Sequence, residues 1–428
     1  MSDNREVGFN TLAIHAGAQP DPATGARVTP IYQTTSYVFD SVDHAAALFG
    51  LETFGNIYTR IMNPTQAVLE QRVAALEGGT AALAAASGHG AQLLTFHVLM
   101  ELGDEFIAAR QLYGGSINQF NHAFKKFGWQ VVWADADDPS SFERALSPKT
   151  KAIFVESIAN PGGIVTDMAA IGAVAKKAGV PFIVDNTLAT PYLIRPKEHG
   201  ADIVVHSLTK FLGGHGNSVG GILVDCGTFD WIASGRYSAL SAPNPSYNGI
   251  VLAETFGNFA FAIAARVLAL RDLGPSIAPM NAFLILTGIE TLPLRIARHC
   301  ENALAVAQWL EAQPQVAWVN YAGLEANKYH TLQKRISPKG AGAVFTFGLK
   351  GGYEAGVDLV SRVELFSHLA NIGDTRSLII HPASTTHRQL TNEQRRLAGA
   401  GDDVVRLSVG LEDKADIIAD LAQALTAA

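Results

Sequence analysis

Short apolar runs alternate with helical stretches from Phe106 to Asp225, and this alternation restricts the fold more than any other feature of the sequence. The apolar runs are FIAAR, QVVWAD, KAIFVES, PFIVDN, DIVVHS and GGILVD. Strands that alternate with helices at this spacing are typical of a largely parallel sheet with helices packed against it. We therefore expect an α/β fold.

Several of these runs end in polar residues, where an apolar strand would meet solvent or a ligand. In open α/β sheets, ligands bind beyond the carboxyl ends of the strands. We therefore expect the polar residues at these ends to converge on one crevice. They are Glu156-Ser157, Asp185-Asn186 and His206-Ser207.

The 428 residues are too many for one simple core, so we expect two large folding units. Residues 1–60 contain many turn formers and predict an extended N-terminal arm, residues 61–270 predict a large domain, and residues 271–428 predict a C-terminal domain. The apolar stretch 250–273 predicts a long helix that links the two domains. Residues 78–100 carry no Asp, Glu, Lys or Arg, and they predict a buried helix after a glycine turn.

Charge and cysteine content exclude several classes of partner. The net charge of -7 is spread along the chain, so neither nucleic acid nor an acidic membrane surface is expected to bind. The N-terminus lacks the apolar core of a secretory signal, and the two cysteines, Cys226 and Cys300, cannot form a disulfide framework. We expect a cytoplasmic protein with packed thiols.

The segment DIVVHSLTKFLGGHG places Lys210 where an apolar strand opens into a glycine-rich turn. Desolvation at such a position lowers the pKa of a lysine and frees its amine as a nucleophile, although most lysines are solvated loop residues. Asp185 ends the run PFIVD and could keep a bound pyridine nitrogen protonated. The sequence Asp185-Asn186-Thr187 is equally suited to cap a helix.

Other polar residues could complete a site for an anionic, flat cofactor. The run SGHG at 87–90 precedes an apolar helix, so its backbone N–H groups could hold a phosphate together with the hydroxyls of Ser207 and Thr209. Tyr113 could stack on a ring or be an ordinary half-buried tyrosine. Arg406, in the run VVRLSV, could bind a substrate carboxylate or a structural one.

The sequence carries no motif for several competing chemistries. Histidines such as His206 and His215 follow neither H-E-x-x-H nor a Cys–His zinc spacing, so no metal site is expected. The chain also lacks GxGxxG after its first strand, the pattern GxxxxGK[ST] and the pattern GxSxG. A Rossmann dehydrogenase, an NTPase and an α/β-hydrolase are therefore disfavoured.

From about Thr11 to the C-terminus, the sequence resembles the Cys/Met metabolism family of enzymes that use pyridoxal 5'-phosphate (PLP), and the segment 202–216 resembles the family's lysine signature. The resemblance implies PLP-dependent transferase fold type I, with a mostly parallel central sheet, helices on both faces, a smaller C-terminal α/β domain and an N-terminal arm. It implies that Lys210 binds PLP covalently, that Asp185 pairs with the ring nitrogen and that Tyr113 stacks on the ring.

The resemblance further implies how the phosphate is held. Tyr58 and Arg60, in NIYTRIMNPT, match a YxR element that reaches the phosphate from the adjacent subunit, so a homotetramer with shared active sites is expected. The other groups that the resemblance assigns to the phosphate are the hydroxyls of Ser207 and Thr209 and the backbone of Gly88 and His89.

The resemblance also implies that four residues contact the amino-acid substrate: Tyr58 and three further positions. Asn160, in ESIANP, and Arg406 match substrate-binding positions of the family. Asn371, in NIGDTRSLIIHPASTTH, stands where many relatives carry serine.

Two features favour the sulfhydrylases within the family: Gly115, where the similar lyases carry cysteine, and extra sequence around residues 227–258. The implied reaction is a γ-replacement, in which O-acetyl-L-homoserine and sulfide, or a small thiol, give L-homocysteine, or methionine, and acetate. A methionine γ-lyase or a cystathionine γ-synthase on the same scaffold is the alternative enzyme. A PLP-binding protein that has lost catalysis is the alternative of another class.

Overall fold

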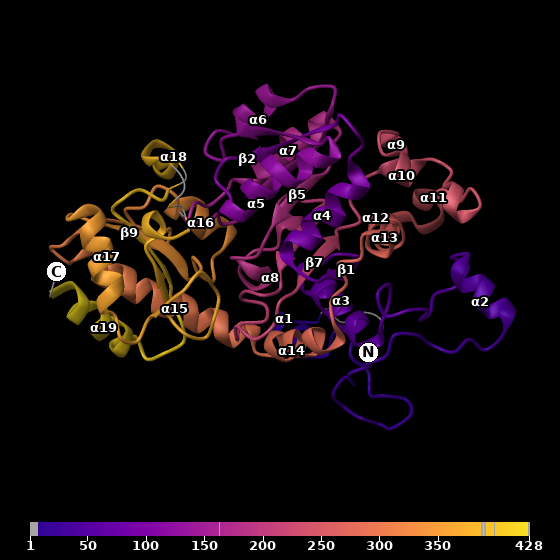
Figure 1. Ribbon diagram of the computed structural model, residues 1–428, viewed down its shortest axis with the longest axis horizontal. Helices are drawn as coiled ribbons and strands as arrows, with labels where there is room; N and C mark the ends of the chain where they lie inside the picture. The colour runs from indigo at the N-terminus through magenta and orange to yellow at the C-terminus, as the bar shows by residue number, and fades with distance from the viewer. Residues whose placement is uncertain (1–6, 162, 387, 389–390, 398, 427–428) are drawn as a thin grey trace.

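The chain folds around two β-sheets, one near the centre of the molecule and one at the left of the view in Figure 1. The computed structural model describes residues 7–161, 163–386, 388, 391–397 and 399–426. The central sheet has seven strands in the order β1-β7-β6-β5-β4-β2-β3, and the second has five in the order β10-β11-β12-β9-β8.

Strands β2 to β7 of the central sheet lie at or close to the predicted apolar runs, whereas β1 was not predicted. Among the described strands of this sheet, only β7 is antiparallel to its neighbours, β1 and β6, and the remaining pairs are parallel. The prediction of a largely parallel α/β sheet is confirmed. The strands are β1 (Ala81–Ala85), β2 (Glu105–Ala109), β3 (Gln130–Ala134), β4 (Thr150–Glu156), β5 (Phe182–Asp185), β6 (Ile203–Ser207) and β7 (Gly221–Asp225).

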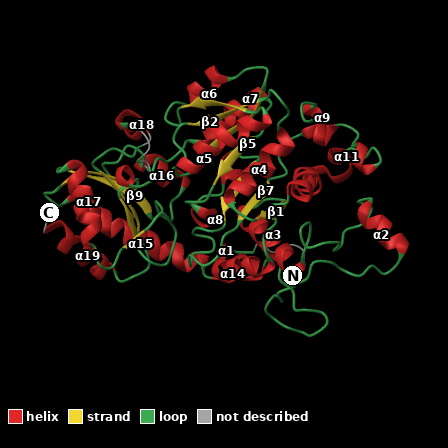
Figure 2. Ribbon diagram, in the orientation of Figure 1, coloured by secondary structure: helices red, strands yellow, loops and turns green. Residues whose placement is uncertain are grey.

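Helices cover both faces of the central sheet, as Figure 2 shows in red around the yellow strands. The principal helices are α3 (Pro64–Glu77), α4 (Gly88–Leu99), α5 (Gly114–Asn118), α6 (Pro139–Ala145), α7 (Met168–Ala178) and α8 (Thr190–Leu193). The region 227–258 forms α9 (Trp231–Ser234), α10 (Ser238–Ser241) and α11 (Leu252–Phe256). The predicted fold, with helices on both faces, is confirmed.

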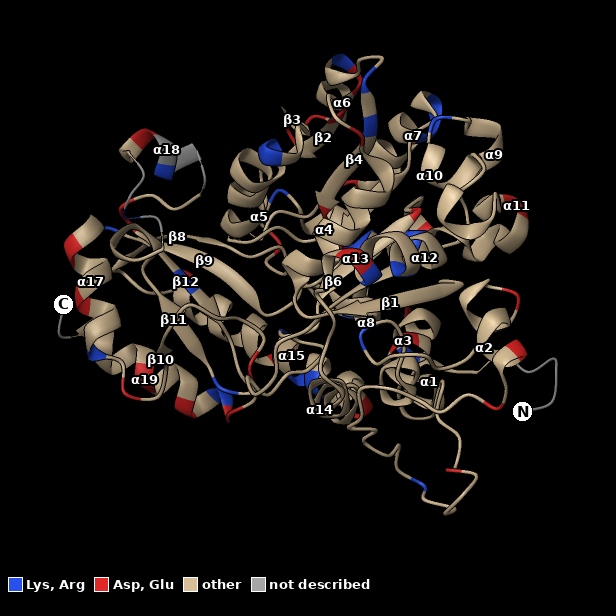
Figure 3. Cartoon of the chain, turned by 45° about the vertical axis from the view of Figure 1, so that its right-hand side comes forward, with Lys and Arg blue, Asp and Glu red and all other residues tan. Residues whose placement is uncertain are grey.

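The second unit is a smaller α/β layer. Its strands are β8 (Val316–Asn320), β9 (Val344–Leu349), β10 (Ser367–His368), β11 (Leu378–Ile380) and β12 (Val404–Ser408). Its helices are α16 (His330–Ile336), α17 (Gly352–Arg362), α18 (Asn392–Leu397) and α19 (Lys414–Thr426). In Figure 3, Lys and Arg are mixed with Asp and Glu over both units, as expected for a chain without charge runs.

Local sequence accounts for the bounds of helix α3. Asn63 caps its start by accepting the backbone N–H of Thr65 at 2.9 Å, and Pro64 occupies the first turn, where its missing N–H costs nothing. Gly78 ends the helix at a φ of 72°, a left-handed conformation that glycine adopts without strain.

The stretch 78–100 is one of three predictions that the structure corrects. It is not a single buried helix, because residues 81–85 form strand β1 and helix α4 begins only at Gly88. The run AALAA is alanine-rich, and its own propensity favours a helix. Pairing with β7 over five residues, from Ala81 opposite Asp225 to Ala85 opposite Gly221, overrides that propensity.

The link between the two units is also different from the prediction. The helical segments α11, α12 (Ala260–Ala264), η6 (Ala265–Leu270) and α13 (Arg271–Leu273) stay with the first unit, where η6 packs against α4. Gly274 and Pro275 end this run, because a left-handed glycine and a proline cannot continue it. Helices α14 (Pro279–Glu290) and α15 (Leu292–Glu311) make the connection, with α15 contacting α14, α8, β8 and α19.

The N-terminal arm is less extended than predicted. Residues Phe9–His15 form helix α1, which packs against α3, α14 and α15, and Val42–Phe49 form helix α2, which projects to the right in Figure 1. Phe9 anchors α1 through an edge-on contact with Tyr192, with ring centroids 5.5 Å apart. The limits of the arm and of the two domains at residues 60 and 270 stay predictions.

Candidate active site

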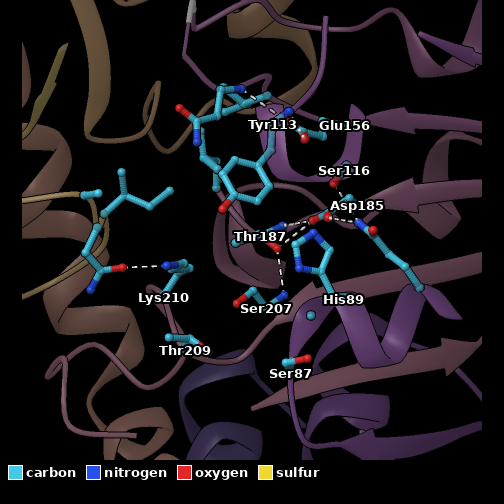
Figure 4. A pocket seen from close by; sticks show the side chains of 18 of the residues that line it. Ser87, His89, Tyr113, Ser116, Glu156, Asp185, Thr187, Ser207, Thr209 and Lys210 are labelled. Carbon is cyan, nitrogen blue, oxygen red and sulfur yellow. Dashed lines mark hydrogen bonds between the residues drawn. The ribbon is translucent and has the colours of Figure 1, made fainter. Parts of the chain in front are cut away.

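A cavity of about 320 Å³ lies at the carboxyl ends of the parallel strands of the central sheet, and Figure 4 shows the side chains that line it. It brings together polar residues that follow β1, β2, β4, β5 and β6, as the topology of an open α/β sheet requires. Ten of the predicted site residues line this cavity: Gly88, His89, Tyr113, Asn160, Asp185, Ser207, Thr209, Lys210, Asn371 and Arg406.

Lys210 lies in the turn after strand β6, beyond Leu208 and Thr209, and its amine points into the cavity (Figure 4). The amine donates a hydrogen bond of 2.5 Å to the side-chain oxygen of Asn371, which comes from the second unit. Burial, together with the nearby positive charge of Arg406, lowers the pKa of Lys210 to about 8. This amine is therefore neutral, and nucleophilic, far more often near neutral pH than an ordinary lysine, although its protonated form still predominates at pH 7.

Asp185 ends strand β5 and lines the same cavity. Its Oδ1 accepts hydrogen bonds from the backbone N–H and the hydroxyl of Thr187, at 3.0 and 2.6 Å, and its Oδ2 accepts one from Gln92 at 3.4 Å. Burial raises the pKa of this carboxyl group, while the bonds from Thr187 lower it. The charge of the His206 imidazolium also lowers this pKa, but no lysine or arginine of the described residues forms an ion pair with Asp185, so the cavity offers a carboxylate without a directly bonded cation.

Helix α4 begins at the other side of the cavity. Ser87 caps it by accepting the N–H of Gly90 at 3.0 Å, which leaves the N–H groups of Gly88 and His89 at the positive end of the helix dipole. Only glycine fits at position 88, because a Cβ there would lie 2.9 Å from the Cβ of Ser207. The hydroxyl of Ser207 therefore lies against the start of the helix.

The hydroxyl of Thr209 lines the cavity but is already engaged within the chain. It donates to the carbonyl of Gly220 at 3.2 Å and accepts the N–H of the same residue at 3.1 Å. The geometry therefore supports Ser207 and the N-terminus of α4 as anion ligands more directly than it supports Thr209.

Tyr113 follows strand β2 and is 49% exposed, with its ring open to the cavity. Its backbone N–H donates to Glu156 Oε1 at 2.7 Å, and Glu156 Oε2 accepts the N–H of Asn160 at 3.0 Å. The ring of Tyr113 needs a glycine beside it, because a Cβ on Gly115 would lie 2.3 Å from a ring carbon. The ring of His89 lies 6.0 Å away at an angle of 31°.

Glu156 is the main site residue whose role the sequence did not indicate. It is 4% exposed, and burial together with the nearby negative charge of Asp185 raises its pKa well above the usual range. Its two oxygens fix the backbone of Tyr113 and Asn160 on either side of the cavity. Gln92 and Thr187, which hold Asp185, were missed as well. Only Thr187 had a signal, since an Asp-x-Thr sequence is typical of a side-chain turn.

Arg406, on β12, closes the cavity from the second unit. Its guanidinium donates to Asn160 Oδ1 at 3.1 Å and to the backbone oxygen of Asn371 at 3.2 Å. Burial lowers its pKa to about 10, so the group stays charged near neutral pH. No carboxylate of the described residues pairs with it, and this leaves an uncompensated guanidinium able to bind an anion.

Tyr58 and Arg60 do not line the cavity of their own chain. They lie in the turn before α3, where the guanidinium of Arg60 is 5.7 Å from the ring centre of Tyr58 and Tyr58 is 41% exposed. Their predicted contact with a neighbouring subunit stays a prediction.

The cavity fits PLP by the chemistry of its lining. It offers a lysine amine of lowered pKa, a carboxylate without a directly bonded cation for the ring nitrogen, and the N-terminus of a helix for the phosphate. These three groups come from different strand ends and face one space. Lys210, Asp185, Ser207 and the backbone of Gly88 and His89 would hold the cofactor there.

Comparisons with known proteins agree with this reading of the cavity. A family model described as Cys/Met metabolism PLP-dependent enzyme matches residues 10–426. The chain is 52% identical to a protein named O-acetyl-L-homoserine sulfhydrylase from Leptospira meyeri, over 97% of this chain and 96% of that protein. It is 48% identical to the homocysteine synthase of Schizosaccharomyces pombe, over 98% of each chain.

A solved structure is similar over nearly the whole fold. It is the crystal structure of a protein from Campylobacter jejuni assigned as an O-acetylhomoserine (thiol)-lyase, and one of its lysines is present as N'-pyridoxyl-lysine-5'-monophosphate. The two structures superpose with a TM-score of 0.94 at 42% sequence identity, covering 98% of this chain and 100% of the other.

Proposed function

Because the chain belongs to the Cys/Met metabolism family of PLP-dependent enzymes, we propose that it replaces the acetate of O-acetyl-L-homoserine with sulfide to give L-homocysteine. The observation that carries the proposal is the single cavity that Lys210, Asp185 and Arg406 line together. The names of relatives that are 43–52% identical over nearly their full length favour this reaction over the γ-lyase and cystathionine γ-synthase alternatives.

The reaction exchanges one bond at the γ-carbon. The bond between Cγ and the acetate oxygen breaks, a bond between Cγ and sulfur forms, and the proton released by hydrogen sulfide balances the acetate that leaves. The bound PLP supplies an electron sink for the negative charge that develops on the substrate's α-carbon.

The side chains of the cavity have separate tasks in this proposal. Arg406 binds the α-carboxylate, helped by Asn160, and thereby orients the substrate. Lys210, with a pKa of about 8, removes the α-proton and returns it at the end. Asp185 keeps the ring nitrogen positively charged, and Tyr113 covers the ring.

Product analysis with three different nucleophiles tests the proposed reaction. Purified enzyme is incubated with O-acetyl-L-homoserine in three mixtures, which contain sulfide, cysteine or no added nucleophile. The products are separated, and mass spectrometry identifies and quantifies them. In the mixture with sulfide we expect homocysteine to be the dominant product, and in the mixture without a nucleophile we expect little 2-oxobutanoate. Dominant cystathionine would make the chain a cystathionine γ-synthase, and dominant 2-oxobutanoate in every mixture would make it a γ-lyase.

A parallel sulfide mixture with O-succinylhomoserine compares the acyl groups, and methanethiol tests methionine formation.

The same proposal includes a cytoplasmic homotetramer in which Tyr58 and Arg60 reach the cofactor phosphate of the adjacent subunit. The position of both residues away from their own cavity supports a role in a neighbour's site. Symmetric assembly would then complete two sites at each shared interface.

Mixed subunits test the shared site. An Arg60→Ala chain and a Lys210→Ala chain are each expected to be nearly inactive alone. Hybrids refolded from both should regain activity, because some sites receive Lys210 from one chain and Arg60 from the other. In a hybrid dimer with two shared sites, one site is intact and the other has both defects. Hybrids verified by mass that stay as inactive as their parents would contradict a site built from two subunits.

A further inference from the structure

Arg295 is a fully enclosed cation outside the cavity that the proposed chemistry does not use. It lies in the first turns of α15, the helix that connects the two units, and is only 5% exposed. Burial lowers its pKa to about 10, so the guanidinium stays charged near neutral pH. No Asp or Glu of the described residues forms an ion pair with it. A buried charge of this kind is stable only if other groups satisfy its donors.

The donors of Arg295 are satisfied by oxygen atoms from three directions. Nη1 donates to the carbonyl of Phe211 at 2.8 Å, and Nη2 donates to the carbonyls of Leu212 and Gly288 at 3.2 and 2.7 Å. Nε donates to the hydroxyl of Thr291 at 3.2 Å. The planar guanidinium therefore joins the turn that carries the active-site lysine to the last turn of α14.

The turn after β6 ends with two carbonyls that accept no backbone N–H group of the described residues. The N–H of Gly214 is bonded to the carbonyl of Lys210 at 2.7 Å, and the N–H of Gly213 is bonded to the carbonyl of Leu208 at 3.0 Å. The next two carbonyls, those of Phe211 and Leu212, face Arg295 instead. Arg295 thus takes the place of a C-terminal cap for the turn in which Lys210 lies.

Glycines allow the guanidinium to approach this closely. A Cβ on Gly214 would lie 2.1 Å from Nη1 of Arg295, and the backbone there has a φ of 75°. A Cβ on Gly288 would lie 2.0 Å from the carbonyl oxygen of Gly213. The lysine turn and the end of α14 are therefore in direct backbone contact around Arg295.

One face of α15 extends this contact to the substrate side of the cavity. His299, one turn beyond Arg295, packs edge-on against Phe211 with ring centroids 5.2 Å apart and bonds the carbonyl of Val409 through Nδ1 at 2.7 Å. Asn302, a further turn along, donates to the carbonyl of Gly410 at 3.0 Å. Residues 409 and 410 directly follow β12, the strand that carries Arg406. Residues at this spacing share one helix face.

We infer that Arg295 is a positioning residue for Lys210, which holds the lysine turn at a fixed distance from the segment that carries Arg406. The inference rests on the proposed role of Lys210. An error of about 1 Å in the placement of a reacting group can reduce a rate by about 10²-fold, so a clamp on the backbone next to Lys210 is expected to affect catalysis. The planar fork of an arginine is needed, because a lysine ammonium cannot reach the same acceptors in fixed geometry.

The test compares Arg295→Lys and Arg295→Met with Arg298→Met, a control on the same helix. The side chain of Arg298 is 50% exposed and pairs with Glu301 at the surface. On PLP-loaded protein we measure kcat, KM and the pH midpoint of the visible absorbance of the lysine-bound cofactor. On cofactor-free protein we measure the rate at which added PLP becomes trapped on Lys210 by borohydride. Mass spectrometry of the peptide reports the trapping.

We expect both Arg295 variants to lose roughly 10- to 100-fold in kcat at a KM within about twofold of the control, as for a misplaced reacting group. We also expect slower trapping and a shifted pH midpoint. A purely structural role would lower only the melting temperature, so kcat, midpoint and trapping rate equal to those of Arg298→Met would overturn the inference. If Arg295→Met does not fold, Arg295→Lys decides by the same measurements. Wild-type protein that never traps PLP on Lys210 would instead refute the proposed function.

Discussion

Replacement of Lys210 by alanine is expected to abolish turnover of O-acetyl-L-homoserine and the visible absorbance of the bound cofactor together. The amine is the only lysine nitrogen that lines the cavity of the described chain, and burial and Arg406 lower its pKa to about 8. General acid–base catalysis contributes about 10²- to 10⁴-fold, and loss of the covalent link adds to that, so we expect a loss of roughly 10³-fold or more. Absorbance spectra and product formation on the same protein sample measure both effects.

The matched control for this variant is Lys177→Ala. The side chain of Lys177 is 77% exposed and pairs with Glu143 at the surface, where an ion pair contributes little to stability. We expect this control to keep both its absorbance and its activity. A Lys210→Ala protein that retains measurable turnover above the level of heat-inactivated enzyme would refute the assignment of Lys210 as the catalytic lysine.

The sequence predicted those parts of the fold in which local pattern and tertiary contacts agree. The strands β2 to β7 were found because each is a short apolar run between helical or turn segments, and burial on both faces of a parallel sheet demands that pattern. Strand β1 was missed because AALAA reads as a helix by propensity, and only its pairing with β7 makes it a strand. The helices α1 and α2 of the arm were missed because they are short and lie among turn formers.

The site was predictable where its residues stand at strand ends, and less so elsewhere. Lys210 and Asp185 share the cavity because parallel strands end at one edge of the sheet, and this follows from sequence pattern and topology alone. The contact of Arg406 and Asn371 with Asn160 and Lys210 depends on how the second unit packs. The charge of Arg406 inside an apolar run made it a candidate, but only the family resemblance indicated Asn160 and Asn371.

Arg295 and Glu156 show what sequence pattern cannot reveal. Both ionisable side chains are buried and bonded to backbone groups far away in the chain: Arg295 to residues 211 and 212, and Glu156 to the N–H of Tyr113. Such contacts require the closed tertiary fold. The strand-end pattern placed Glu156 near the crevice but did not indicate its bonds to backbone N–H groups, and no local signal separates Arg295 from the solvated charges of a surface helix.

Replacement of Asp185 by asparagine is expected to reduce kcat by about 10²-fold while leaving PLP attached to Lys210. A carboxylate close to a cation raises the pKa of that cation by about 1–3 units, and each unit corresponds to about tenfold in the population of the charged form. The substitution keeps the shape and an acceptor for Thr187 but removes the charge. The ring nitrogen should therefore lose its proton at lower pH, and activity should decline as the pH rises from below neutral. The pH profile of kcat is the measurement.

The surface carboxylate Asp358 provides the control, since it is 53% exposed and pairs with Arg362 one turn away. Asp358→Asn should keep the wild-type pH profile. The two carboxylates differ in environment, because burial raises the pKa of Asp185 and the hydrogen bonds from Thr187 and Gln92 only partly offset this rise. Burial thus destabilises the charged form of the carboxylate, and a nearby cation would stabilise it. The interaction between Asp185 and the protonated ring nitrogen should therefore be strong. An Asp185→Asn enzyme with an unchanged pH profile and rate would show that the ring nitrogen does not depend on this carboxylate.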